Sequence, residues 1–231
     1  MKTNIYIKKE NIMKFGNFAV FGDSYSTFEG YIPEGYGCWY GPHKSEENGV
    51  LSVEKTWWYP IAEEEGNRLL FNNSYSGSTI CNTSYEKRYC PDSSFVGRMK
   101  VFAGHADDLD TVFVFAGTND TWALSPLGEK IEKPYAEYTD DELRCVLPAT
   151  HCLLDYLRTT LPKTRIVLLL NNWLSAPIKE ALHRGGEKYG CDIIDLPDIS
   201  RNSGHPNADG MREIREAIFA HYAAHPACQN A

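Results

Sequence analysis

Five short apolar runs set the pattern of this chain. Each is strand-sized and continuous, without the polar alternation of a half-exposed strand. Such runs are typical of strands buried on both faces, as in a parallel sheet. They cover residues 17–21, 68–72, 111–116, 165–170 and 192–196.

Helical signals fill the segments between and after these runs. Thr56 is a predicted cap, Pro148 a predicted disturbance, and glycines end two of the segments. The expected helices cover 57–65, 139–161, 177–189 and 208–224. Strands that alternate with helices predict a doubly wound, three-layer α/β/α domain with a five-stranded parallel sheet. Right-handed crossovers then place all carboxyl ends of the strands along one edge, where ligands bind.

Two long segments fit no regular element. Residues 28–55 and 121–138 are rich in aromatic residues, and the first also in glycine. Their aromatic content argues against disorder. Two interpretations stay open: surface decoration that packs on itself, or walls of a binding pocket.

Length and charge narrow the class of protein. A chain of 231 residues fits one domain. We place it at 13–231 and interpret 1–12 as an N-terminal extension, with Met13 as an alternative start. The formal net charge of −8 disfavours a nucleic-acid partner. The apolar runs are too short to span a bilayer, which predicts no membrane partner, and the beginning of the chain does not match a signal peptide.

Cysteine usage points to a reducing compartment. The chain has seven cysteines at irregular spacings, and no C-x-x-C pattern occurs. An odd number and the lack of an export signal favour free thiols, so we expect a cytoplasmic protein. A Cys81–Cys90 disulfide is the less favoured alternative.

A polar block follows four of the five predicted strands. In chain order these blocks are GDSYS (22–26), NNSYSG (72–77), GTND (117–120) and SGHPN (203–207). Since parallel strands share one carboxyl edge, a serine, a glycine turn, an asparagine and a histidine are expected to converge there.

This set of residues matches the needs of nucleophilic acyl transfer. The hydroxyl of Ser24 is a weak nucleophile until a base such as His205 takes its proton. Attack on an ester carbonyl creates an oxyanion, which fixed hydrogen-bond donors stabilise. The backbone N–H groups of Ser24 and Gly77 and the side-chain amide of Asn119 are the candidate donors.

The four blocks, in this order, resemble the signature blocks of the SGNH/GDSL hydrolases and span residues 22–207. The resemblance implies a flavodoxin-like fold and esterase, lipase, thioesterase or carbohydrate deacetylase activity without a metal or another cofactor. By match, Ser24 is the nucleophile, Gly77 and Asn119 are oxyanion donors, and His205 is the base.

One position departs from the family pattern. The family usually has an aspartate three residues before the histidine, and here Asn202 stands there. An asparagine can orient an imidazole, but it carries no charge to stabilise imidazolium. The alternatives are Asn202 itself, a backbone carbonyl, Asp198 from the preceding turn, or a site that is weak or inactive.

Other polar residues have structural interpretations. Asp23 and Asp120 flank the catalytic candidates, and we interpret both as turn-forming residues. Asn207 is expected to shape the start of the last helix. His221 and His225 are spaced i,i+4 but have no acidic residue between them, so we predict no metal site there.

We therefore predict a serine carboxylic ester hydrolase that acts on a small acyl ester, with an O-acetylated carbohydrate as the favoured substrate. Aromatic residues are the candidate substrate-binding groups: Tyr25, Tyr36, Trp39, Tyr40 and Trp122. Alternatives are a thioesterase or lysophospholipase of the same family, and an inactive binding module that kept the fold. A flavodoxin-like nucleotide binder is a weaker alternative, since no phosphate-binding glycine loop follows the first strand. The oligomeric state is not indicated by the sequence.

Overall fold

The central sheet has five parallel strands, as predicted. A computed structural model describes residues 13–225, so the expected extension at 1–12 lies outside the described residues. The strand order is β2-β1-β3-β4-β5, and every pairing is parallel. The strands are β1 (Gly16–Gly22), β2 (Asn67–Asn72), β3 (Thr111–Phe115), β4 (Arg165–Leu170) and β5 (Asp192–Asp195).

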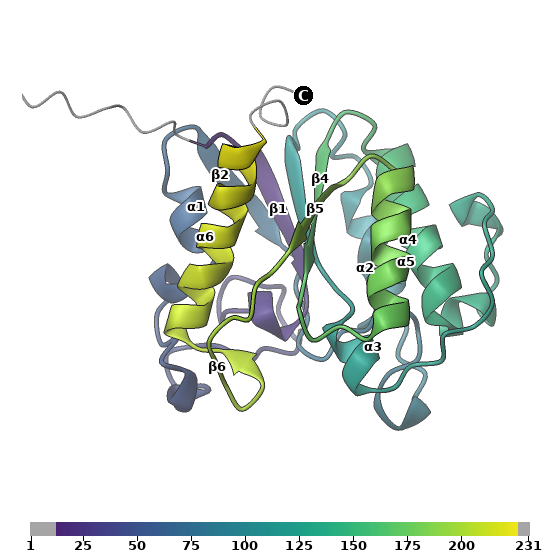
Figure 1. Ribbon diagram of the computed structural model, residues 1–231, viewed down its shortest axis with the longest axis horizontal. Helices are drawn as coiled ribbons and strands as arrows, with labels where there is room; N and C mark the ends of the chain where they lie inside the picture. The colour runs from purple at the N-terminus through teal and green to yellow at the C-terminus, as the bar shows by residue number, and fades with distance from the viewer. Residues whose placement is uncertain (1–12, 226–231) are drawn as a thin grey trace, which may run out of the picture.

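Helices cover both faces of this sheet and complete the predicted three layers (Figure 1). One face carries α1 (Tyr59–Ala62) and α6 (Ala208–Ala224). The other face carries α2 (Phe95–Arg98), α4 (Val146–Thr160) and α5 (Ala176–Lys188). A further short helix, α3 (Thr118–Trp122), follows β3 at the carboxyl edge.

The sheet separates two apolar cores, and this explains why the apolar runs are continuous. In β3, Val112 and Val114 face the core under α4 and α5, whereas Phe113 and Phe115 face the core under α6. The same alternation holds in β4. Because each buried large side chain contributes about 1.5–3 kcal/mol, both faces of these strands select apolar residues.

Helix boundaries differ from the sequence prediction in two places. The helix expected at 57–65 is reduced to α1, and the one expected to start at Thr139 starts at Val146, after a separate 3₁₀ turn. Pro148 lies in the first turn of α4, where its missing N–H has no intrahelical partner to lose. The α6 boundaries match the prediction, and Asn207 caps this helix by accepting from the Gly210 N–H at 3.0 Å.

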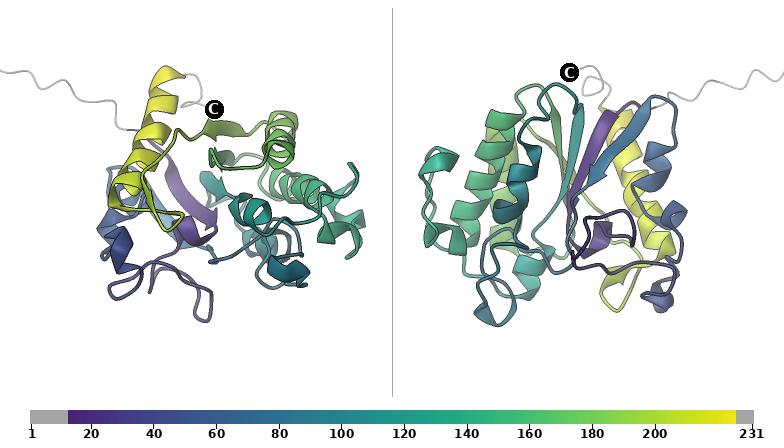
Figure 2. Two further views of the ribbon diagram at one scale, coloured as in Figure 1. Left: turned by 60° about the horizontal axis from the view of Figure 1, so that its bottom comes forward. Right: turned by 180° about the vertical axis from the view of Figure 1, so that it is seen from behind.

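A small antiparallel hairpin at the carboxyl edge was not predicted. It pairs β6 (Arg201–Asn202) with β7 (His205–Pro206). Its two turn residues, Ser203 and Gly204, have φ of +50° and +79°, as in the two-residue type I′ hairpin turn. Figure 2 (left) brings this edge forward, with the hairpin beside the end of β1. The Ser-Gly pair was the sequence signal for this turn.

Two further features bear on the sequence expectations. None of the helices in residues 13–225 is long and apolar enough to cross a membrane. The cysteines in the same range, Cys81 and Cys90 included, carry free thiols. Cys228 lies outside the described residues.

Candidate active site

Ser24 and His205 lie within hydrogen-bond distance across the carboxyl edge. Ser24 follows β1 in a 3₁₀ turn, which Asp23 caps by accepting from the Tyr25 N–H at 3.0 Å. His205 projects from β7, and its Nε2 is 3.0 Å from Ser24 Oγ. Both residues are buried, with 2% and 7% of their surface exposed. This is the geometry that a serine and its general base require.

A backbone carbonyl fixes the orientation of the imidazole. His205 Nδ1 lies 3.2 Å from the carbonyl oxygen of Ser203, which the tight hairpin turn places beside the ring. Because a carbonyl oxygen only accepts, this contact favours the tautomer with the proton on Nδ1. Nε2 then presents its lone pair to the Ser24 hydroxyl, ready to take the proton.

Neither of the side chains considered from the sequence, Asn202 and Asp198, forms a hydrogen bond or ion pair with the imidazole of His205. Asn202 Nδ2 donates instead to the backbone carbonyl of Glu47. The Asp198 side chain is 81% exposed and pairs with Arg201 at 3.0 Å. The sequence left open which group orients His205. In this structure, the group in hydrogen-bond contact with Nδ1 is a backbone carbonyl, that of Ser203.

Aromatic rings surround the imidazole of His205. The indole of Trp39 lies parallel to it, with ring centroids 3.6 Å apart and an interplanar angle of 9°. Tyr25 and Trp122 approach at 5.5 and 5.7 Å. Burial among these groups lowers the pKa of His205 below its ordinary 6.5, opposed by the Ser203 carbonyl and the charge of Glu47.

Two tyrosines expected to bind substrate hold the hairpin instead. Tyr25 and Tyr40 are fully buried, so neither has a ring face to offer a ligand. The Tyr25 hydroxyl donates to the Gly204 carbonyl at 2.6 Å, and that of Tyr40 to the Pro206 carbonyl at 2.7 Å. Trp39 and Trp122 remain partly exposed. Tyr36, in the long segment 28–55, packs at a tilt against Tyr75 of the loop after β2, with ring centroids 5.0 Å apart.

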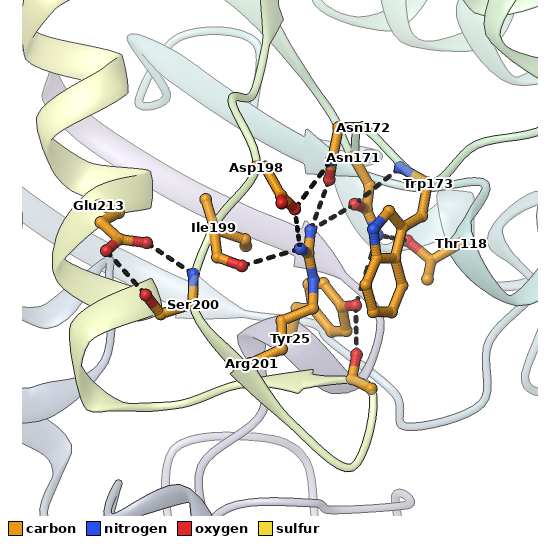
Figure 3. A network of polar contacts seen from close by, with 11 residues as sticks. Tyr25, Thr118, Asn171, Asn172, Trp173, Asp198, Ile199, Ser200, Arg201 and Glu213 are labelled. Atoms are coloured by element: carbon orange, nitrogen blue, oxygen red, sulfur yellow. Dashed lines mark hydrogen bonds and ion pairs between the residues drawn. The ribbon is translucent and has the colours of Figure 1, made fainter.

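Two polar residues missed by the sequence analysis also fix the hairpin. Asn48 Nδ2 donates to the carbonyls of Asn202 and His205, at 2.9 and 3.0 Å. The guanidinium of Arg201 binds the side-chain oxygens of Asn171 and Asn172 at 2.8 and 2.7 Å (Figure 3). The hairpin is thereby anchored to the end of β4. In the sequence, the only indication of this anchor was the pair of asparagines directly after the fourth apolar run.

The candidate oxyanion donors come from the segments that follow β1, β2 and β3. Asn119 is in α3, directly after β3. Its Oδ1 accepts from the Tyr85 hydroxyl at 2.8 Å, while its Nδ2 is buried without a partner among the described residues. A buried donor left unpaired is unfavourable unless a ligand uses it. Gly77 has φ of +83°, a conformation that glycine adopts at little cost.

Buried charged groups support these segments. Asp120 ties the Gly77 loop to α3 by accepting from the Ile80 N–H at 2.8 Å and from the Cys81 N–H. Burial raises the pKa of Asp120 to about 6 and that of Asp23 to about 7. Burial also lowers the pKa of Arg98 to about 9, where its guanidinium donates to Asn73 and Ser78. These contacts agree with a structural role for both aspartates.

The second long segment, residues 121–138, helps to form a pocket away from Ser24 and His205. Residues 130–132, α4 and α5 enclose about 260 Å³ on the outer face. Ser24, Gly77, Asn119 and His205 do not line it. Of the two long segments, 28–55 therefore builds the candidate site, through Trp39, Tyr40 and Asn48, whereas 121–138 contributes only Trp122.

Comparison with known proteins places this fold and site in a family. The model of the GDSL-like lipase/acylhydrolase family matches residues 16–222, which include all five strands of the sheet. The chain belongs to this family. Membership makes it an ester hydrolase and agrees with the four sequence blocks at the strand ends. No curated protein matches the sequence.

Solved structures support the same assignment. A protein from Bacteroides ovatus described as a GDSL-like lipase is 37% identical, with a TM-score of 0.82, over 90% of this chain and 98% of that one. A similarly described protein from Bacteroides uniformis is 36% identical, with a TM-score of 0.81, over 90% and 96%. A carbohydrate acetylesterase from Sinorhizobium meliloti is 17% identical, with a TM-score of 0.56, over 90% and 99%. The last comparison shows the shared fold alone.

Proposed function

We propose that this GDSL-family protein hydrolyses small acyl esters through an acyl-enzyme on Ser24. The observation that carries the proposal is the 3.0 Å contact between Ser24 Oγ and His205 Nε2, with Nδ1 on a carbonyl. That arrangement leaves a lone pair on Nε2 for the serine proton. The buried, unpaired amide of Asn119 also supports the proposal.

In the proposed first step, Ser24 Oγ attacks the ester carbonyl while its proton passes to His205 Nε2. The oxyanion accepts hydrogen bonds from the Ser24 and Gly77 N–H groups and from Asn119 Nδ2. The intermediate collapses to an acyl-serine, and His205 gives its proton to the leaving alkoxide. In the second step, water attacks the acyl carbonyl while its proton passes to His205 Nε2. The bond between the acyl carbon and Ser24 Oγ then breaks, His205 returns the proton to Ser24 Oγ, and the acid leaves.

The favoured substrate is an acetyl ester of a carbohydrate. Trp39 and Trp122 stay partly exposed beside the Ser24–His205 pair. Aromatic rings in that position offer a flat apolar surface on which a sugar ring can pack. The carbohydrate acetylesterase with the same fold makes acetylated sugars the first substrates to compare.

The test is hydrolysis of 4-nitrophenyl acetate by the protein and by Ser24→Ala. We expect turnover by the first and a loss of about 10⁴-fold or more in the second, since a nucleophile removed from its base leaves only residual catalysis. Acid quenching should trap one acetyl group on the Ser24 peptide in mass spectrometry. Equal rates for both proteins would overturn the proposal, and turnover of long-chain esters alone would overturn the substrate preference.

A second candidate is a binding module without hydrolysis, favoured by the absence of a carboxylate contact to His205 within residues 13–225. A fluorophosphonate probe separates the two, because only an activated serine reacts with it. We expect labelling of the protein at Ser24 and none in Ser24→Ala. No labelling of either protein would favour the binding module.

A further inference from the structure

The proposed reaction places a positive charge on His205, and its usual partner is missing. When Ser24 attacks, the imidazole becomes imidazolium, which the aspartate of a catalytic triad stabilises. Here the ring nitrogens contact only Ser24 Oγ and the Ser203 carbonyl in the described part of the chain. A carbonyl orients the ring, but it supplies only a partial charge.

One face of the imidazole is covered by the indole of Trp39. The centroid distance of 3.6 Å and the angle of 9° describe two rings in full parallel contact. The face of an aromatic ring is the negative side of its quadrupole, and tryptophan is the strongest of the natural rings in attracting a cation. Tyr25 and Trp122 lie further out and at steep angles.

Trp39 is fixed to the same turn that carries the nucleophile. The backbone N–H of Trp39 donates to Thr27 Oγ1 at 2.9 Å, and the Thr27 hydroxyl donates to the Ser24 carbonyl at 3.1 Å. Its own carbonyl accepts from Ser45 at 2.8 Å. The indole N–H has no hydrogen-bond partner among the residues described. The ring is therefore positioned by its backbone and by the stack on His205.

We propose that the indole face of Trp39 stabilises the imidazolium form of His205 during acyl transfer, a role that the carboxylate has in a triad. Trp39 thus acts as a positioning residue through His205. This inference rests on the proposed function for its catalytic meaning. The equilibrium between imidazole and imidazolium can be measured without it.

The other groups that touch the ring of His205 carry no negative charge. Ser24 and Tyr25 come from the 3₁₀ turn after β1, and burial raises the pKa of Tyr25 to about 12, which keeps its hydroxyl neutral. Trp122 of α3 is neutral. Glu47 favours imidazolium through its charge, but it forms no hydrogen bond or ion pair with the ring within residues 13–225. Trp39 opposes the burial that lowers the pKa of His205.

The test is a graded weakening of the ring quadrupole without a change of shape. Mono-, di- and tetrafluorinated tryptophan would be placed at position 39 alone, and the same analogues at Trp58 as a control. Trp58 is fully buried, donates from its indole N–H to the Ser26 carbonyl at 2.9 Å, and has no ring contact with His205. The readouts are the pH profile of kcat/KM and an NMR titration of His205 in the Ser24→Ala background.

We expect kcat/KM to fall step by step with fluorination at position 39, by about 3- to 30-fold in total, from the usual range of cation–π energies. The pKa of His205 should fall with it, moving the acid limb to lower pH. Substitutions should follow the same order, with Trp39→Phe above Trp39→Leu in rate. The analogues at Trp58 should change neither quantity.

A pKa and a rate that do not change along the series at position 39 would overturn the inference, because a merely structural ring has the same shape in every analogue. Failure of the proposed function is a separate outcome. In that case the fluorine-free protein and Ser24→Ala are equally inactive, while the NMR titration still reports whether Trp39 favours imidazolium.

Discussion

Different kinds of side chain support Ser24 and His205 in the candidate active site. Around Ser24 and the candidate oxyanion donors, buried ionisable groups hold the loops: Asp23 caps the turn, Asp120 ties two loops, and Arg98 spans several backbone groups. Around His205, the hydrogen bonds and ring contacts of the imidazole within residues 13–225 are with a hydroxyl, a carbonyl and aromatic rings. Arg201, in the neighbouring strand β6, binds the side chains of Asn171 and Asn172.

Buried charged side chains therefore have a structural role around Ser24, whereas neutral groups surround His205. Where the structure must present hydrogen-bond donors, buried carboxylates fix backbone N–H groups that would otherwise be unpaired. Where the structure must hold a proton acceptor, neutral groups keep the histidine in its unprotonated form at neutral pH. A carboxylate beside His205 would raise its pKa, whereas the observed surroundings lower it.

The largest expected effect is on the donor side. Asn119→Ala removes the unpaired amide, and we expect kcat to fall by about 10²–10³-fold, as for the loss of one oxyanion-hole donor. Tyr85→Phe is the matched control, because it keeps Asn119 but removes the hydroxyl that orients its amide. We expect an intermediate loss. If Asn119→Ala keeps full kcat, Asn119 is not an oxyanion donor.

The buried charge of Asp23 should appear in the pH dependence of stability. Its pKa is about 7 in the folded protein and 3.8 ordinarily, so folding favours the protonated carboxyl. The favourable contribution is complete below about pH 4 and is lost as the pH rises through 7. Asp23→Asn keeps an acceptor for the Tyr25 N–H, and we expect it to gain on the order of 1–3 kcal/mol relative to the parent between pH 4 and 8.

Urea unfolding at several pH values measures this difference directly. The difference in the free energy of unfolding between the parent and Asp23→Asn should be nearly constant at acid pH and should grow as the pH rises. A difference that stays constant from pH 4 to 8 would contradict the raised pKa of Asp23.

A smaller effect is expected on the histidine side. Because His205 must be unprotonated to act as a base, and its pKa is lowered, kcat/KM should stay high to below pH 6.5. Glu47→Gln removes the one charge that raises this pKa, so the acid limb should move a few tenths of a pH unit lower. An acid limb well above pH 7 would indicate a carboxylate partner.

The fold and the contact between Ser24 and His205 could be predicted from the sequence, for identifiable reasons. The apolar runs mark strands buried on both faces, and the polar blocks mark their carboxyl ends. Ser24 and His205 are 181 positions apart, yet a parallel sheet brings strand ends together whatever the separation along the chain. The family model over residues 16–222 confirms the assignment that these blocks suggested.

The contacts that hold His205 in place could not be predicted from the sequence, because they are tertiary contacts. The stack with Trp39, the bonds from Tyr40 and Asn48, and the tight hairpin join segments with no periodic signal. Tyr25 and Tyr40 had the composition of a sugar-binding surface, but their hydroxyls serve buried carbonyls. Composition does not show which way a ring faces.

The most direct test of a base without a carboxylate is the kcat/KM of Asn202→Ala and Asp198→Ala for 4-nitrophenyl acetate. Since neither side chain forms a hydrogen bond or ion pair with the imidazole of His205, we expect both variants to stay within about threefold of the parent. A true triad carboxylate or its amide equivalent would give a loss of about 10⁴-fold. A loss of that size in either variant would contradict the carbonyl-oriented histidine and show that the side chain reaches the ring during catalysis.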